Sequence, residues 1–391
     1  MASSSRNFRI RTITAGVRLE NAARLGEVEQ ALGFLEMARS HFEGREYEIQ
    51  TLRIATQPLA DYLPDWTSRA AFGAIEGLDR LAAAERVVCS IGPVITDDRY
   101  EEGFARWAAE LVQRTSEISF SASVASARNG VHWRTVRSAA EAIAAIAGAS
   151  RGGEGNFRFA ATAFAPPGTP FFPAAYFTQG RAFSIGLESP RLVQEAFLES
   201  EDIGEAKRIL GSRMEAALRP VEESAREIAL ETGWAYLGID VSPAPGLDAS
   251  IGGAIESLTG EPFGSASTLA ACAAITDVLR ALGVQKCGYS GLMLPVLEDT
   301  VLAKRVVEGR YGVSELLLYS SVCGTGLDVV PLPGDTPPED LGRLVQDVAA
   351  LAAKYDKPLS ARLFPVPGKA VGEPVRFDNP HLTGAVVMEL P

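Results

Sequence analysis

The sequence predicts an α/β protein that folds as one closed barrel over residues 1–391. Short apolar runs rich in β-branched residues alternate roughly ten times with longer stretches of helical period, a pattern typical of a parallel sheet with right-handed crossovers. Although 391 residues would suggest two or three domains, no linker and no shift in composition divides the chain. Both observations favour a single large barrel over two open-sheet domains.

The first half of the chain alternates regularly between the two kinds of element. Its amphipathic stretches predict helices at 26–42, 66–84, 100–114 and 135–146, the first with Val28, Leu32, Leu35 and Phe42 on one face. Its apolar runs predict strands at 10–17, 47–54, 86–91, 118–126 and 156–164. The pair Gly92-Pro93 is expected to end the third of these strands.

The second half continues the alternation. Strands are predicted at 182–187, 235–241, 316–322 and 359–366, with a short apolar run at 386–390. Helices are predicted at 201–232, where Pro220 should break or kink the chain, and at 267–282. Thr336-Pro-Pro-Glu339 combines a capping box with proline in the first turn, which predicts a further helix start.

Composition excludes several classes of function. Lys+Arg 37 against Asp+Glu 49 gives a net charge of −12, which argues against nucleic acid as a partner. Three histidines and four cysteines, none at CxxC spacing, argue against a zinc site and a disulfide framework. The sequence lacks the GxGxxG, GxxxxGK[ST] and GxSxG patterns, so we expect no nicotinamide cofactor, no P-loop nucleotide and no hydrolase elbow.

The chain also lacks targeting and membrane signals. No run of 18 uncharged apolar residues occurs, and the N-terminus has no apolar signal-peptide core. Few, scattered cysteines fit a reducing interior, so a cytoplasmic location is expected, with residues 1–7 as a loose start and a homo-oligomer left open.

Carboxylates recur in the polar turns after the predicted strands, where parallel α/β proteins hold their ligands. They are Asp240, Asp248, Glu298, Asp299 and Asp328. When two carboxyl groups lie close together, one can act as a general acid and the other as a general base. Asp240 and Asp328 are the favoured pair for these roles. Their oxygens would also suit a hard divalent cation such as Mg²⁺ or Ca²⁺. For Asp248 and Asp299, a helix N-cap is the alternative role.

Other side chains complete the candidate site. Cys323 follows the predicted strand 316–322 and precedes two glycines, so it is either an exposed nucleophile or a small buried hydrophobe. Three arginines inside predicted strands must be paired or face a cavity, where they would recognise a carboxylate or phosphate. The candidate substrate-binding residues beyond the carboxylates are Arg11, Arg53, Arg362, Ser290 and Tyr176.

Several motifs together resemble one family. They lie at 10–17 (IRTITAGV), 240–252 (DVSPAPGLDASIG), 288–299 (GYSGLMLPVLED), 323–337 (CGTGLDVVPLPGDTP) and 361–373 (ARLFPVPGKAVGE). The chain is similar to the domain-of-unknown-function family 711, also called uncharacterised protein family 0210. The resemblance implies the ten-stranded β/α barrel of pyruvate formate-lyase and the glycyl radical enzymes, with Cys323 on a central finger loop. No glycyl radical motif appears near the C-terminus, so radical chemistry is not implied.

Two functions remain open at this stage. The first is an enzyme that hydrolyses, cleaves or isomerises a small polar metabolite, with Cys323, Asp240 and Asp328 as catalytic residues. The alternative is a non-catalytic barrel that binds a small molecule or regulates another protein. With none of the three histidines convincingly placed, proton transfer is expected to fall to the carboxylates or the thiol.

Overall fold

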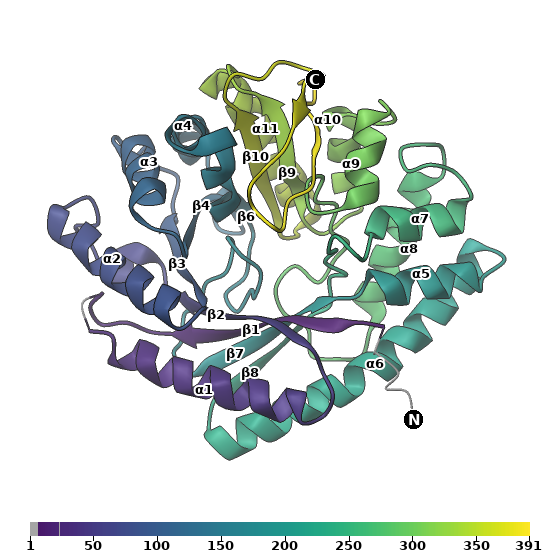
Figure 1. Cartoon of the computed structure of the whole chain (residues 1–391), viewed down its shortest axis with the longest axis horizontal. Coiled ribbons are helices and arrows are strands. Elements are labelled where there is room, and N and C mark those ends of the chain that lie inside the picture. Colours follow the sequence, from purple (N-terminus) through teal and green to yellow (C-terminus); the bar gives the residue numbers. More distant parts are fainter. Residues whose placement is uncertain (1–6, 23) are drawn as a thin grey trace.

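The computed structural model describes residues 7–22 and 24–391, and their strands form one large sheet that curves around the centre of the molecule (Figure 1). The strand order is β8-β7-β1-β2-β3-β4-β6-β10-β9, and β5 pairs with β4. The strand bounds are β1 Arg9–Val17, β2 Ile49–Thr56, β3 Val88–Ile95, β4 Ile118–Ser126, β5 Gly130–Val131, β6 Phe159–Ala163, β7 Ala182–Glu188, β8 Ala235–Asp240, β9 Gly326–Pro333 and β10 Leu359–Val366. A separate two-stranded hairpin pairs β11 Pro374–Val375 with β12 Ala385–Val386.

The sheet is mixed, which corrects the prediction of a parallel one. Strands β1, β2, β3, β4 and β6 run parallel to one another, but β7 is antiparallel to β1 and β10 is antiparallel to β6. Strands β8 and β9 follow the direction of β7 and β10. A parallel return needs a crossover that is usually helical, whereas residues 164–181 between β6 and β7 contain no helix. The chain therefore reverses direction after the Pro-rich loop.

The ladder ends at β8 on one side and at β9 on the other, and an irregular segment, 285–298, contacts both ends. Beside β8, Ile239 N donates to Gln285 O at 2.8 Å, and Cys287 N donates to Ile239 O at 3.1 Å. Beside β9, Val296 N donates to Asp328 O at 3.0 Å. Segment 285–298 thus occupies the space between the two edges without forming a continuous strand.

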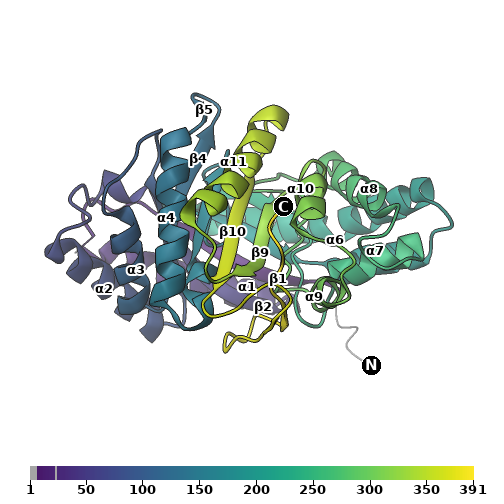
Figure 2. The same ribbon diagram turned by 90° about the horizontal axis from the view of Figure 1, so that it is seen from above.

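Helices cover the outside of the sheet (Figure 1), and Figure 2 shows α4 and α11 on the outer side of β10. Each buries one apolar face; α3, for example, packs Phe104 and Trp107 against Phe120 of β4. The helix bounds are α1 Gly26–Glu43, α2 Arg69–Ala84, α3 Phe104–Arg114, α4 Trp133–Ala149, α5 Pro190–Leu198, α6 Ile203–Thr232, α7 Ile251–Thr259, α8 Thr268–Ala281, α9 Thr300–Val307, α10 Val313–Ser320 and α11 Pro338–Tyr355, with 3₁₀ turns η1 Leu59–Asp61 and η2 Arg151–Arg158.

One predicted strand, 316–322, is wrong, because most of it lies in helix α10. The short apolar run LLLYSSV is equally compatible with a buried helix, and periodicity alone cannot separate the two. Glu315 Oε2 accepts a hydrogen bond from Gly312 N at 2.8 Å and caps this helix. The strand of this region is instead β9, so Asp328 lies inside a strand rather than six residues after one.

Prolines account for the other local differences. Strand β3 continues through Gly92-Pro93, where the pairing with β4 is irregular, so the expected end of the strand is wrong. Helix α6 continues through Pro220 as one helix of 30 residues, so the chain does not break there. Helix α11 begins with proline as expected, but Thr336 Oγ1 donates to Pro333 O at 2.7 Å, and no side chain caps the helix.

Two further expectations concern the chain start and the membrane. Residues 1–6 of the predicted loose start lie outside the described residues, whereas Asn7 Nδ2 donates to Glu195 Oε2 at 2.7 Å. Among the helices of the described residues, none is both long enough and apolar enough to cross a membrane.

Candidate functional site

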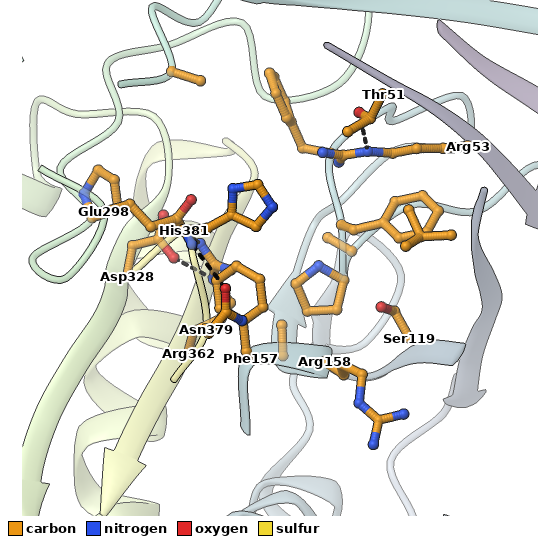
Figure 3. A pocket seen from close by; sticks show the side chains of 18 of the residues that line it. Thr51, Arg53, Ser119, Phe157, Arg158, Glu298, Asp328, Arg362, Asn379 and His381 are labelled. Atoms are coloured by element: carbon orange, nitrogen blue, oxygen red, sulfur yellow. Dashed lines mark hydrogen bonds and ion pairs between the residues drawn. The ribbon is translucent and has the colours of Figure 1, made fainter. Parts of the chain in front are cut away.

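A cavity of about 680 Å³ lies inside the curve of the sheet (Figure 3). Its walls come from the inward faces of β1, β2, β3, β4, β6, β9 and β10, from η2, and from loops around residues 116–117, 171–174, 244–245, 289–298 and 378–381. Strand residues that line it include Arg11, Arg53, Ser119, Asp328 and Arg362. The cavity therefore gathers side chains that are distant in the sequence, as ligand sites do.

Only some of the turns where ligand-binding residues were expected line the cavity, among them those that contain Phe171, Ala244 and Glu298. Val88, Ser119 and Ala160 line it from the first or second position of β3, β4 and β6. The turns that follow β2, β3 and β4 contribute no lining residue among the described part of the chain. The rule that ligands bind at carboxyl ends applies to a wholly parallel sheet, and here the antiparallel strands bring other loops over the opposite end.

Two of the three strand arginines are paired with buried carboxylates. Arg11 Nη2 lies 2.9 Å from Glu298 Oε2, and Arg362 Nη2 lies 2.5 Å from Glu298 Oε1. Arg11 Nη1 also contacts Glu188 Oε2 at 3.0 Å and donates to Pro245 O at 2.7 Å. Burial opposes ionisation of Glu298, but Arg362 and Arg11 together hold its pKa below the usual value. Glu298 is thus a buried bridge between two guanidiniums.

Asp328 is the second carboxylate of this cluster. Arg362 Nε donates to its Oδ1 at 2.5 Å, while its Oδ2 accepts no hydrogen bond from the described residues. Burial raises the pKa of Asp328 against the opposing effect of Arg362. An oriented carboxylate with one free oxygen and a raised pKa is suited to accept or donate a proton.

Arg53 differs from the other two strand arginines because no carboxylate pairs with it among the described residues. Its Nε donates to Thr51 Oγ1 at 3.1 Å, and its guanidinium carbon lies 5.1 Å from the centre of the Phe172 ring. Burial and repulsion from Arg11 lower the pKa of Arg53 to about 9, so the group still carries its charge at pH 7. Figure 3 shows its guanidinium directed into the cavity.

His381 also faces this space, which the sequence did not indicate. It comes from the C-terminal segment, yellow in Figure 1, whose loop between β11 and β12 reaches the inside of the sheet. Its ring stacks on Phe157 with 6.5 Å between centroids and 9° between planes. Burial and the Arg11 guanidinium lower the pKa of His381, so the imidazole is neutral at pH 7. An irregular loop has no periodicity, and only the rarity of histidine pointed to this residue.

Two of the predicted acidic residues hold the backbone instead of facing the cavity. Asp240 is fully buried and accepts hydrogen bonds from Ser242 N and Oγ, Tyr289 N and Ser290 N at 2.6–3.1 Å. Asp299 caps α9 through Val301 N and Leu302 N, and it also accepts from Ser250 Oγ, Ile251 N and Gly252 N at the start of α7. For Asp299 the N-cap alternative is therefore the observed role.

Three other predicted residues lie at the margins. Asp248 pairs with Arg9 at 2.5 Å and with Arg191 at 3.0 Å, and it lines a small pocket beside the main cavity. Tyr176 donates to Ala165 O at 3.1 Å within the Pro-rich loop and does not line the cavity. Ser290 donates to Cys287 O at 2.7 Å.

Cys323 is not the exposed loop-tip thiol that its sequence context suggested. It follows α10, its side chain is 1% exposed, and it packs in the main apolar core. It borders a separate pocket of about 490 Å³ together with Ser290 and Lys357, whose ammonium donates to Cys323 O at 2.6 Å. Of the three predicted catalytic residues, the structure places only Asp328 at the cavity.

The side chains around the cavity do not make a cation site. Within residues 7–22 and 24–391, no three His, Cys, Asp or Glu side chains gather as a metal-ion site. Asp240 and Asp328, the pair expected to hold Mg²⁺ or Ca²⁺, do not share a site: Asp328 lines the cavity and Asp240 does not. At the cavity itself, arginines occupy both oxygens of Glu298 and one of Asp328. A hard cation needs several free oxygen ligands, so this donor set does not suit one.

The fold and cavity define a class: a mixed α/β protein with an arginine- and carboxylate-lined cavity enclosed by its sheet. The chain belongs to the family described as "Uncharacterised ACR (DUF711)", whose model matches residues 2–378. A UPF0210 protein of Desulforudis audaxviator is 30% identical over 403 residues, which cover 95% of this chain and 88% of the relative. A UPF0210 protein of Pyrobaculum arsenaticum is 30% identical over 83% of this chain and 75% of its own length. These names state no activity, so the function has to be argued from the cavity.

Proposed function

We propose that this protein is an enzyme that binds a small organic anion in the cavity and transfers a proton to or from it. The observation that carries the proposal is Arg53, a half-buried guanidinium directed into the cavity without a carboxylate partner among the described residues. An unpaired charge that is partly buried costs stability, and such costs concentrate at functional sites. A carboxylate or phosphate of the ligand would supply the missing partner.

The groups for proton transfer lie in the same cavity. Asp328 is oriented by Arg362 and keeps one oxygen free, and His381 presents a neutral imidazole. A neutral imidazole accepts a proton, and a carboxyl group with a raised pKa donates one. Hydrolysis, lysis and isomerisation of an organic acid all require such transfers. Because the two groups come from β9 and from the C-terminal loop, a ligand between them is approached from two sides.

Arg53→Gln is expected to weaken the binding of organic anions by about 10- to 100-fold, the worth of a charged hydrogen bond. The same change should leave the folded protein as stable as the wild type or more stable, because it removes a half-buried charge that Arg11 repels. A thermal-shift panel of carboxylates and phosphate esters finds the ligand, titration calorimetry measures its affinity, and urea unfolding measures stability.

Arg137→Gln is the matched control, since Arg137 also stacks on an aromatic ring, Tyr100 at 4.5 Å, but lies outside the cavity. Equal anion binding by wild type and Arg53→Gln would reject the proposal. Turnover of the bound compound, followed by NMR, separates an enzyme from the alternative of a binding barrel: Asp328→Asn should retain the Arg53-dependent binding of the carboxylate or phosphate group and lose turnover.

We also propose that the sheet closes into a barrel like that of pyruvate formate-lyase. The support is segment 285–298, which contacts both edge strands, and the two sets of strands that run in opposite directions. Closure predicts slow hydrogen exchange at the amides of Cys287 and Val296, whose bonds to β8 and β9 join the edges. Exchange at the rate of exposed loops would show that the sheet is open.

A further inference from the structure

The positive and negative side chains that line the cavity nearly balance one another, which restricts the charge of a ligand. Four arginines, Arg11, Arg53, Arg158 and Arg362, and five carboxylates, Glu117, Glu154, Glu298, Asp328 and Asp378, line the cavity. A ligand with a single negative charge would satisfy Arg53 but leave the enclosed site with an excess of negative charge. A ligand with separated charges and no net charge would keep the balance.

The free hydrogen-bonding capacity shows where those charges belong. Glu298 has both oxygens on arginines, and Glu188 Oε1 and Oε2 accept from Arg9 and Arg11. Of the two buried carboxylates that line the cavity, Glu298 and Asp328, only Asp328 keeps an oxygen without a hydrogen-bond partner from the described residues. Arg53 uses Nε alone, so its two terminal nitrogens are available. In Figure 3 Arg53 and Asp328 lie on opposite sides of the space.

A third feature is an apolar wall. Phe171, Ala174, Ala244, Tyr289 and Met293 form a buried cluster separate from the main core, and every member lines the cavity. A wall of this kind takes an apolar substituent, because burying it removes apolar surface from water.

We propose that the ligand is an amino acid or a similar zwitterion with an apolar side chain. Its carboxylate binds Arg53, its ammonium group donates to the free oxygen of Asp328, and its side chain lies against the cluster of Phe171 and Met293. This inference rests on the proposed function, since it gives the chemical class of the anion held by Arg53.

The test compares matched compounds by titration calorimetry at millimolar concentration: phenylalanine, 3-phenylpropionate and phenethylamine, then leucine, 4-methylpentanoate and 3-methylbutylamine. In each set the zwitterion is expected to bind about 10-fold more tightly than either singly charged analogue, because each charge adds one charged hydrogen bond. Asp328→Asn should remove the advantage of the zwitterion over the deaminated acid. Glu256→Gln, which alters an arginine-bound carboxylate outside the cavity, should retain it.

The outcomes separate the two proposals. If the deaminated acid binds as tightly as the amino acid and still depends on Arg53, the zwitterion inference is overturned and the proposed function stands. If the amine alone binds best, the inference is likewise overturned. If no carboxylate in either set binds in an Arg53-dependent way, both proposals are rejected, while circular dichroism of each variant checks that it is folded.

Discussion

Glu298→Gln is expected to destabilise the folded protein by about 3–5 kcal/mol, the cost of breaking a buried ion pair from one side. The carboxylate accepts from Arg11 at 2.9 Å and from Arg362 at 2.5 Å, and all three side chains are buried. An amide of the same size keeps only one acceptor oxygen and turns an NH₂ group toward a guanidinium. The substitution also removes a favourable charge interaction with Arg53, because the Glu298 carboxylate favours the charged form of that arginine.

Urea unfolding followed by tryptophan fluorescence measures this effect. Glu76→Gln is the control, because Glu76 pairs with Arg114 at the surface, where ion pairs contribute little to stability. Arg53→Gln combined with Glu298→Gln should recover part of the lost stability, since one fewer unmatched cation remains. A Glu298→Gln protein that unfolds at the wild-type midpoint would show that the arginines need no carboxylate bridge.

Asp240→Asn is expected to cost about 2–3 kcal/mol at pH 7, because buried donors lose their acceptor. Three backbone amides and the Ser242 hydroxyl donate to the two carboxylate oxygens of Asp240, which hold the loop 287–291 against the end of β8. An asparagine offers one oxygen and places an NH₂ group against the remaining donors. The loop, including Tyr289 of the cavity wall, should loosen.

The effect of this substitution should depend on pH with a definite sign. Burial raises the pKa of Asp240 to about 6, above the value of about 3.9 in an unfolded chain. The stabilisation from proton binding is therefore complete below pH 4 and is lost as the pH rises through 6. Asparagine does not titrate, so the difference in unfolding free energy between wild type and Asp240→Asn should be larger at pH 4 than at pH 7, by about 2 kcal/mol. A difference that grows with rising pH would mean that the hydrogen bonds outweigh burial.

Local pattern was sufficient for most helices and strands. The predicted strand 118–126 and the predicted helix 26–42 match β4 and α1 closely, since amphipathic periodicity reports which face of an element is buried. Periodicity gave the wrong element at 316–322. This short run is apolar on all sides and has no informative period, and most of it lies in α10. The mixed direction of the sheet was also missed, because the direction of a strand is set by how the chain returns to the sheet.

The site was only partly predictable. The rule that an arginine in a strand must be paired or face a cavity singled out Arg11, Arg53 and Arg362, and the structure shows that all three line the same cavity. The sequence favoured Asp240 together with Asp328, because a carboxylate near the end of a strand has the same sequence context whether it accepts hydrogen bonds from backbone amides or faces a ligand. His381 was not identified, since its position depends on the path of the C-terminal loop.

The sequence by itself determined the alternation of elements and the presence of arginines that require partners. Only the tertiary structure decided which carboxylate meets which arginine, and left Arg53 without one. The physical reason is range: periodicity and turn chemistry act over a few residues, whereas the bridge from Arg11 to Glu298 spans 287 positions and exists only once the sheet has curved around it.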